Sequence, residues 1–145
     1  MYVFSIKKIL LIIHRFHMVK RVLVLGILSL LFVASCAERK ADPAKIEEAT
    51  KLFANKDFEK GVTILDDLAK SSPNDEALKK ARVEAHITYG NYFMYESLLP
   101  PKEKYPSALR QYRIASDIDP ANVEAKQNIS LIEGIYNQMG RVVPN

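Results

Sequence analysis

The sequence is short of the residues on which most enzyme active sites are built. Its 145 residues include one cysteine, three histidines and no tryptophan. The five glycines never cluster, so no glycine-rich loop that could cradle a phosphate is present. The carboxylates alternate with lysines, as they do on the solvated faces of helices. The composition therefore predicts no catalytic residue, no metal site and no cofactor.

Acidic residues are missing from the first 35 positions, which carry five basic side chains: Lys7, Lys8, Arg15, Lys20 and Arg21. The rest of the chain holds 16 of the 21 basic residues and all 17 acidic ones, a net charge of −1. The overall net charge of +4 therefore comes from the N-terminal stretch. Beyond that stretch no basic stripe with interleaved aromatic residues remains, which excludes a general affinity for nucleic acids.

An apolar run from Val22 to Ser35 follows the basic stretch Met18-Val-Lys-Arg. The run is too short to span a bilayer but suits the central region of a secretory signal peptide. It ends at Val33-Ala34-Ser35-Cys36, which resembles the lipobox of bacterial lipoproteins, although that family usually has Leu where Val33 stands. The resemblance implies cleavage before Cys36 and acylation of its sulfur, with palmitate as a suitable label. The alternative is a single uncleaved membrane anchor with an incidental cysteine.

Residues 1–17 form a second basic and apolar stretch ahead of a signal peptide that is already complete, so Met18 is predicted to be the true start. Alternatively, both stretches form one long basic region, which would still direct export. In either case His14 and His17 would be absent from the mature protein.

Residues 36–42 are predicted to be a lipidated cysteine and a short tether, because they are small and charged with no periodic apolar face. By resemblance to enterobacterial lipoproteins, the absence of Asp at position 37 removes the usual signal for retention in the inner membrane. We therefore expect a lipid-anchored protein of the bacterial cell envelope, on the outer membrane and facing the periplasm. In a cell with one membrane it would lie on the outer face of that membrane.

The residues from Pro43 onward predict helices. The first spans Pro43–Asn55, with Asp42 as N-cap, and the second spans Phe58–Ser71. The third is unusually long, from about Asp75 to Leu98. The double proline Pro100-Pro101 ends it, because a residue before proline is disfavoured in the helical region.

Two more helices are predicted toward the C-terminus. The stretch Lys104–Asn122 has an amphipathic pattern that ends at an Asp-Pro pair. The last helix follows Pro120, with Asn122 as N-cap and Gly140 as the residue that terminates it. One face of this helix is expected to cover the preceding hairpin through Ile129, Ile132, Ile135 and Tyr136.

The second and fourth helices repeat at a constant offset of 47 residues. Phe58, Gly61, Leu65, Leu68 and Pro73 correspond in turn to Tyr105, Ala108, Tyr112, Ala115 and Pro120. The pattern resembles the tetratricopeptide repeat (TPR), whose usual period is 34 residues, with extra residues in the third helix and around the double proline. Over residues 43–140 the resemblance implies an all-α fold of antiparallel helix hairpins, with two hairpins and a C-terminal capping helix. Residues 141–145 are expected to form a tail.

The resemblance implies partner binding on the concave surface that the first helices of successive hairpins form. The residues expected there are Ile46, Thr50, Phe53, Ile87, Asn91, Met94, Tyr95, Leu131 and Ile135. Most are apolar, and exposed apolar side chains on a small domain usually mark a contact site. The alternative is that the long third helix shifts the stacking and buries several of them in the core. His86 lies where the repeat buries a large side chain, which predicts a packed histidine.

Two functions are compatible with these features. One is a membrane-anchored adaptor that binds a protein or peptide during envelope assembly or secretion. The alternative is a periplasmic binder of a small apolar ligand that works with a transporter. Because repeat arrays usually need three or more units, two hairpins and a cap also predict weak homo-oligomer formation.

Overall fold

The computed structural model describes residues 39–144, which form five α-helices and one π-helical turn and no strand. The predicted all-α fold of helix hairpins is therefore confirmed. Within these residues, no helix combines the length and the apolar character that crossing a membrane requires. The predicted signal peptide, the lipobox with Cys36 and the first residues of the tether, 37 and 38, lie outside the described residues.

The first hairpin consists of α2 (Pro43–Ala54) and α3 (Phe58–Ser71), as the sequence predicts. The Asp42 side chain accepts a hydrogen bond from the backbone N–H of Ala44 at 2.9 Å, which satisfies one free donor at the start of α2. Lys56 has a φ angle of 62° in the turn, so the chain reverses within three residues. The two helices pack closely at Gly61, where an added Cβ would collide with the ring of Phe53.

The second hairpin begins with α4 (Glu76–Asn91), and the predicted end of this helix at Leu98 is wrong. The chain changes to a π-helical turn, η2 (Tyr92–Glu96), and then becomes extended at Ser97. The Ser97 N–H donates to the carbonyl of Tyr92, five residues earlier, at 2.9 Å. This wider turn ends the helix two residues before the predicted boundary.

The return helix α5 (Pro101–Ile118) begins three residues earlier than predicted. Pro100 is extended with a ψ angle of 155°, and Pro101 occupies the first helical position, where its missing N–H costs nothing. Pro106 consequently lies inside the helix, where it lacks the N–H that would bond to the carbonyl of Lys102.

The last helix, α6 (Val123–Gln138), agrees with the prediction. The Asn122 side chain accepts a hydrogen bond from the Ala125 N–H at 2.9 Å, and Gly140 terminates the helix with a φ angle of 65°. The tail beyond it folds back, because Arg113 in α5 donates from Nη1 to the carbonyl of Pro144 at 2.7 Å.

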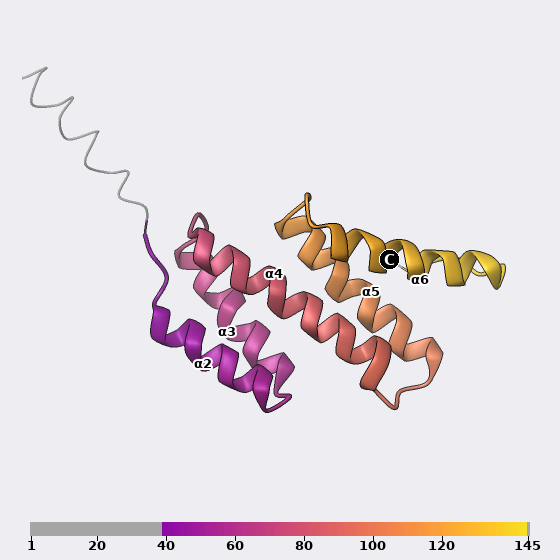
Figure 1. Ribbon diagram of the computed structural model, residues 1–145, viewed down its shortest axis with the longest axis horizontal. Helices are drawn as coiled ribbons and strands as arrows, with labels where there is room; N and C mark the ends of the chain where they lie inside the picture. The colour runs from indigo at the N-terminus through magenta and orange to yellow at the C-terminus, as the bar shows by residue number, and fades with distance from the viewer. Residues whose placement is uncertain (1–38, 145) are drawn as a thin grey trace, which may run out of the picture. The chain divides into compact units, whose positions relative to one another are not determined.

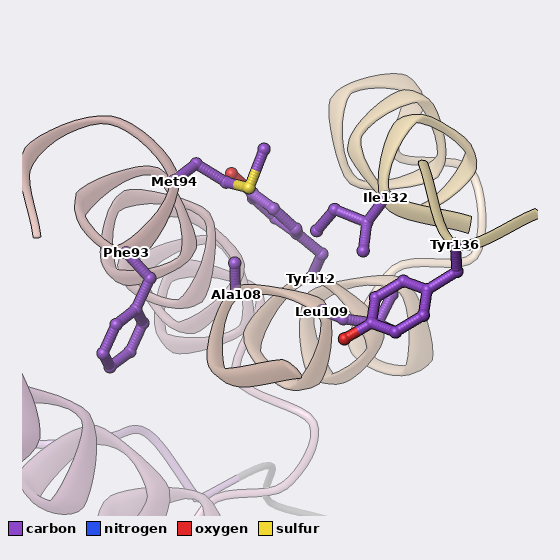
Figure 2. Close-up of a cluster of buried hydrophobic side chains, with 7 residues drawn as sticks. All are labelled: Phe93, Met94, Ala108, Leu109, Tyr112, Ile132 and Tyr136. Carbon is purple, nitrogen blue, oxygen red and sulfur yellow. The ribbon is translucent and has the colours of Figure 1, made fainter. Parts of the chain in front are cut away.

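The helices stack in sequence order, with α4 between the first hairpin and α5, and with α6 against α5 (Figure 1). The largest core cluster joins η2, α5 and α6 and contains Phe93, Met94, Ala108, Leu109, Tyr112, Ile132 and Tyr136. Figure 2 shows the ring of Tyr112 between Met94 and Ile132. This ring also fills the space next to Gly90, where an added Cβ would lie 2.6 Å from Tyr112 Cε1.

Candidate functional site

The concave surface differs from the predicted one at two positions. Ile87 and Met94 are 8% and 7% exposed and belong to the hydrophobic core, so their side chains are not available to a partner. Ile87 packs with Val83, Ala115 and Ala125, where α4 meets α5 and α6. The expectation that both residues line an open surface is therefore corrected.

Asn91 is half-buried, and its side chain makes two hydrogen bonds to neighbouring helices. Its Oδ1 accepts from the Tyr112 hydroxyl at 2.6 Å, and its Nδ2 donates to Glu124 Oε1 at 3.2 Å. Burial also raises the pKa of the Tyr112 hydroxyl, which therefore remains a proton donor in this pair. Asn91 thus links α4 to both α5 and α6.

The other predicted residues are partly or fully accessible and belong to three elements, α2, η2 and α6. Ile46 and Phe53 are half-buried against the core beneath α2, and Thr50 is exposed between them. Tyr95 is 66% exposed in η2. On α6, Leu131 is 49% exposed and Ile135 is half-buried.

A hollow between α2 and α4 brings Thr50 and Phe53 together with residues that the sequence analysis missed. It encloses about 150 Å³ and is lined by Thr50, Phe53, Leu65, Ala81, Glu84, Ala85 and Thr88. We call it the α2–α4 groove. Its floor consists of Leu65 and the small side chains of Ala81 and Ala85, while Thr50, Glu84 and Thr88 are exposed at its rim.

The side chain of Asp75 connects the start of α4 to the residue that precedes the cap of α2. Its Oδ1 accepts from the N–H of Leu78 at 3.0 Å and so caps α4, while its Oδ2 accepts from the N–H of Ala41 at 2.9 Å. These hydrogen bonds from Leu78 and Ala41 hold the pKa of Asp75 below its ordinary value. The N-terminal ends of the two helices are thus joined, and the α4 residues of the groove lie about two turns before those expected on the concave surface.

The sequence carried a signal for the missed positions. Ala81, Glu84, Ala85 and Thr88 recur at intervals of three and four, so they share one face of α4. Three of them are small, which is typical of a helix face that forms a shallow groove. The buried Ala41 was likewise missed, because it was assigned to the tether.

A polar cluster, buried at His86 and Gln111 and partly exposed at Asp66 and Arg82, connects α3, α4 and α5 on the other side of α4. His86, 2% exposed, has Nδ1 at 2.8 Å from Gln111 Oε1 and Nε2 at 3.5 Å from Asp66 Oδ1. Arg82 donates from Nε to the same Asp66 oxygen at 2.8 Å. Burial alone would raise the pKa of Asp66, but hydrogen bonds from His86 and Arg82 outweigh it and hold that pKa below the ordinary value. His86 is therefore a packed histidine, as predicted.

Comparison with protein-family models, with curated proteins and with solved structures finds no match. The resemblance to tetratricopeptide proteins and to lipoproteins therefore depends on the residues quoted above. The interpretation of the groove depends on its own geometry.

Proposed function

We propose that this protein is a lipid-anchored adaptor of the bacterial cell envelope that binds a protein or peptide partner in the α2–α4 groove. The observation that carries the proposal is the groove itself, an apolar hollow with a polar rim that lies between the first helices of the two hairpins. Two of the residues that line it, Thr50 and Phe53, were also expected on the binding surface from the sequence. The lipobox supplies the membrane attachment, since two or three acyl chains anchor a protein stably.

The size of the groove favours a side chain of a protein partner over a free ligand. A volume of about 150 Å³ equals that of an engineered apolar cavity that holds benzene, so the groove accommodates one aliphatic or aromatic side chain. Pockets for drug-sized molecules usually enclose about 300–1,000 Å³. The groove is therefore too small for a drug-sized apolar ligand, and a larger hollow of about 670 Å³ around Ser72, Asp75 and Arg82 has a mostly polar lining.

The binding test compares two exposed threonines that lie on different helices. A photoreactive amino acid replaces Thr88 at the rim of the groove, or Thr63 on α3 as the control, in the full chain in living cells. We expect a discrete cross-linked protein from position 88 only. Thr50→Arg, which places a long charged side chain over the groove, should abolish that product. Equal cross-linking from both positions would contradict the proposal.

The anchoring test changes Cys36 alone. Cys36→Ser should leave an uncleaved precursor that incorporates no labelled palmitate, while the parent chain incorporates it and fractionates with the outer membrane. Unchanged processing of the variant would refute the lipoprotein assignment without affecting the groove. Extraction of the purified chain followed by mass spectrometry tests the alternative, because a retained small molecule would favour the ligand-binding function.

A further inference from the structure

The rim of the α2–α4 groove carries one charged side chain, that of Glu84. This side chain is exposed, and among residues 39–144 no lysine, arginine or histidine nitrogen lies within 4 Å of its carboxylate. Lys80, one turn earlier on α4, makes no such pair with it. Some other surface carboxylates are paired, for example that of Glu47 with Lys51 at 2.8 Å. The Glu84 carboxylate is therefore available to a basic group from outside the described fold.

Water solvates the Glu84 carboxylate in the free protein, but a bound segment changes this. The groove encloses only about 150 Å³, so a side chain that fills it lies beside the rim and displaces part of the water around Glu84. Removal of water from a charge costs free energy unless an opposite charge or hydrogen-bond donors replace it. An apolar or acidic segment would leave this cost uncompensated, whereas a lysine or arginine would offset it. Glu84 therefore favours a basic occupant of the groove.

A second carboxylate lies further along the same side of α4. Asn91 follows Glu84 by seven residues, which is about two turns and about 10 Å, so the two residues share one face of the helix. The Asn91 Nδ2 donates to Glu124 Oε1 at 3.2 Å, and this uncharged donor does not neutralise the carboxylate. Glu124 is exposed and makes no ion pair within the described part of the chain. Carboxylates thus lie before and after the exposed Thr88 along this side of α4.

We propose that the groove binds a basic peptide segment, which inserts one large aliphatic or aromatic side chain and places a lysine or arginine against Glu84. A second basic side chain, about 10 Å further on, pairs with Glu124; this spacing corresponds to about three residues of extended chain or seven of a helix. The inference rests on the proposed function, because it names the chemistry of the partner that the groove accepts. The apolar floor supplies affinity, and the carboxylates supply selectivity against acidic segments.

Selection from a random peptide display library tests this chemistry without knowledge of the natural partner. The purified full chain is presented in a nonionic detergent. Thr50→Trp serves for counter-selection, because it covers the groove without a change in charge. We expect the peptides that bind the parent but not Thr50→Trp to combine a large apolar residue with a neighbouring lysine or arginine. A groove-dependent class without this basic residue would overturn the proposal.

Charge variants locate the contact on the protein. Glu84→Gln removes the charge with little change in shape and should weaken the binding of a selected peptide by about two- to fivefold, as expected for a partly solvated ion pair. Glu84→Lys should weaken it by about tenfold or more through repulsion. Glu48→Lys makes the same change of charge on α2, about 200° around the helix from Thr50, and should alter the affinity by about twofold or less. Circular dichroism should show the parent's helix content for all three variants, because both positions are exposed.

Reversal of the charge in the peptide identifies the pair. A selected peptide whose basic residue is replaced by glutamate should bind Glu84→Lys more tightly than it binds the parent. If no peptide depends on the groove, both this inference and the proposed adaptor function of the groove are overturned. If groove-dependent peptides bind Glu84→Gln as tightly as the parent, or if Glu48→Lys weakens binding as much as Glu84→Lys, only the inference is overturned.

Discussion

The three helical glycines of the described residues offer a sharp test of the packing, because the same substitution should have three different effects. Gly90→Ala places a methyl group 2.6 Å from Cε1 and 2.9 Å from Cδ1 of Tyr112, which is fully buried. Overpacking of this kind costs about 1–3 kcal/mol. Displacement of the ring would also weaken the hydrogen bond from Tyr112 to Asn91, which contributes about 1 kcal/mol to stability. Alanine favours a helix over glycine by about 0.5–1 kcal/mol, which offsets part of this cost. The net decrease in the free energy of unfolding is therefore about 1–3 kcal/mol.

The other two positions provide matched controls. Gly134→Ala meets no described atom beyond the adjacent turns of its own helix within 4 Å and should stabilise the fold by about 0.5–1 kcal/mol. Gly61→Ala meets the edge of the Phe53 ring, which is half-buried and able to rotate, so its effect should fall between the other two. Urea unfolding at low protein concentration, which keeps the chain monomeric, gives the three free energies of unfolding. If Gly90→Ala is as stable as Gly134→Ala, the close approach of α4 and α5 is refuted.

Three further predictions concern the core and the caps. Met94→Ala should lower the free energy of unfolding in urea by about 2–5 kcal/mol, because Met94 is buried. Tyr95→Ala should change it by about 0.5 kcal/mol or less, because Tyr95 is exposed. Similar losses would contradict the assignment of Met94 to the core and Tyr95 to the surface. The pKa of Asp66 is depressed, so its stabilising contribution is present above about pH 4 and is lost as the pH falls further. Asp66→Asn should therefore have a lower free energy of unfolding than the parent at about pH 7, and this free energy should fall less between about pH 4 and pH 2. An acid profile identical to that of the parent would exclude this role. Asp75→Ala should lower the melting temperature more than Asp42→Ala, because Asp75 accepts hydrogen bonds from two backbone N–H groups and Asp42 from one. The reverse order would show that the hydrogen bond from Ala41 to Asp75 contributes little to stability.

Most helix boundaries followed from local chemistry. Asp42 and Asn122 cap helices and Gly140 ends one as predicted, because capping depends on hydrogen bonds between residues two or three apart. The two boundaries around the double proline were predicted less well. There the chain adopts a π-helical turn and Pro106 is accommodated within α5, and no short-range pattern distinguishes these from an ordinary helix end.

The candidate site could be predicted only in part. Thr50 and Phe53 were expected from the resemblance to tetratricopeptide repeats, in which the first helix of each hairpin lines the concave surface, and both line the groove. The α4 residues that line the groove with them were not predicted. The 47-residue repeat aligns α3 with α5, but it does not determine the position of α4 along the axis of α2. The hydrogen bond that joins the N-terminal ends of the two helices, from Ala41 to Asp75, connects residues 34 positions apart, which the repeat does not show.

The sequence by itself determined that this part of the chain is helical, where most helices begin and end, and which faces are apolar. These properties depend on side chains three or four positions apart, which the sequence displays directly. Only the tertiary structure decided which apolar residues became core and which remained accessible. Ile87 and Met94 have the same apolar character as Leu131, but two further helices cover them, whereas the chain provides no helix beyond α6 within the described residues to cover Leu131. Burial depends on the number and register of neighbouring helices, and these are set by contacts between residues far apart in the chain.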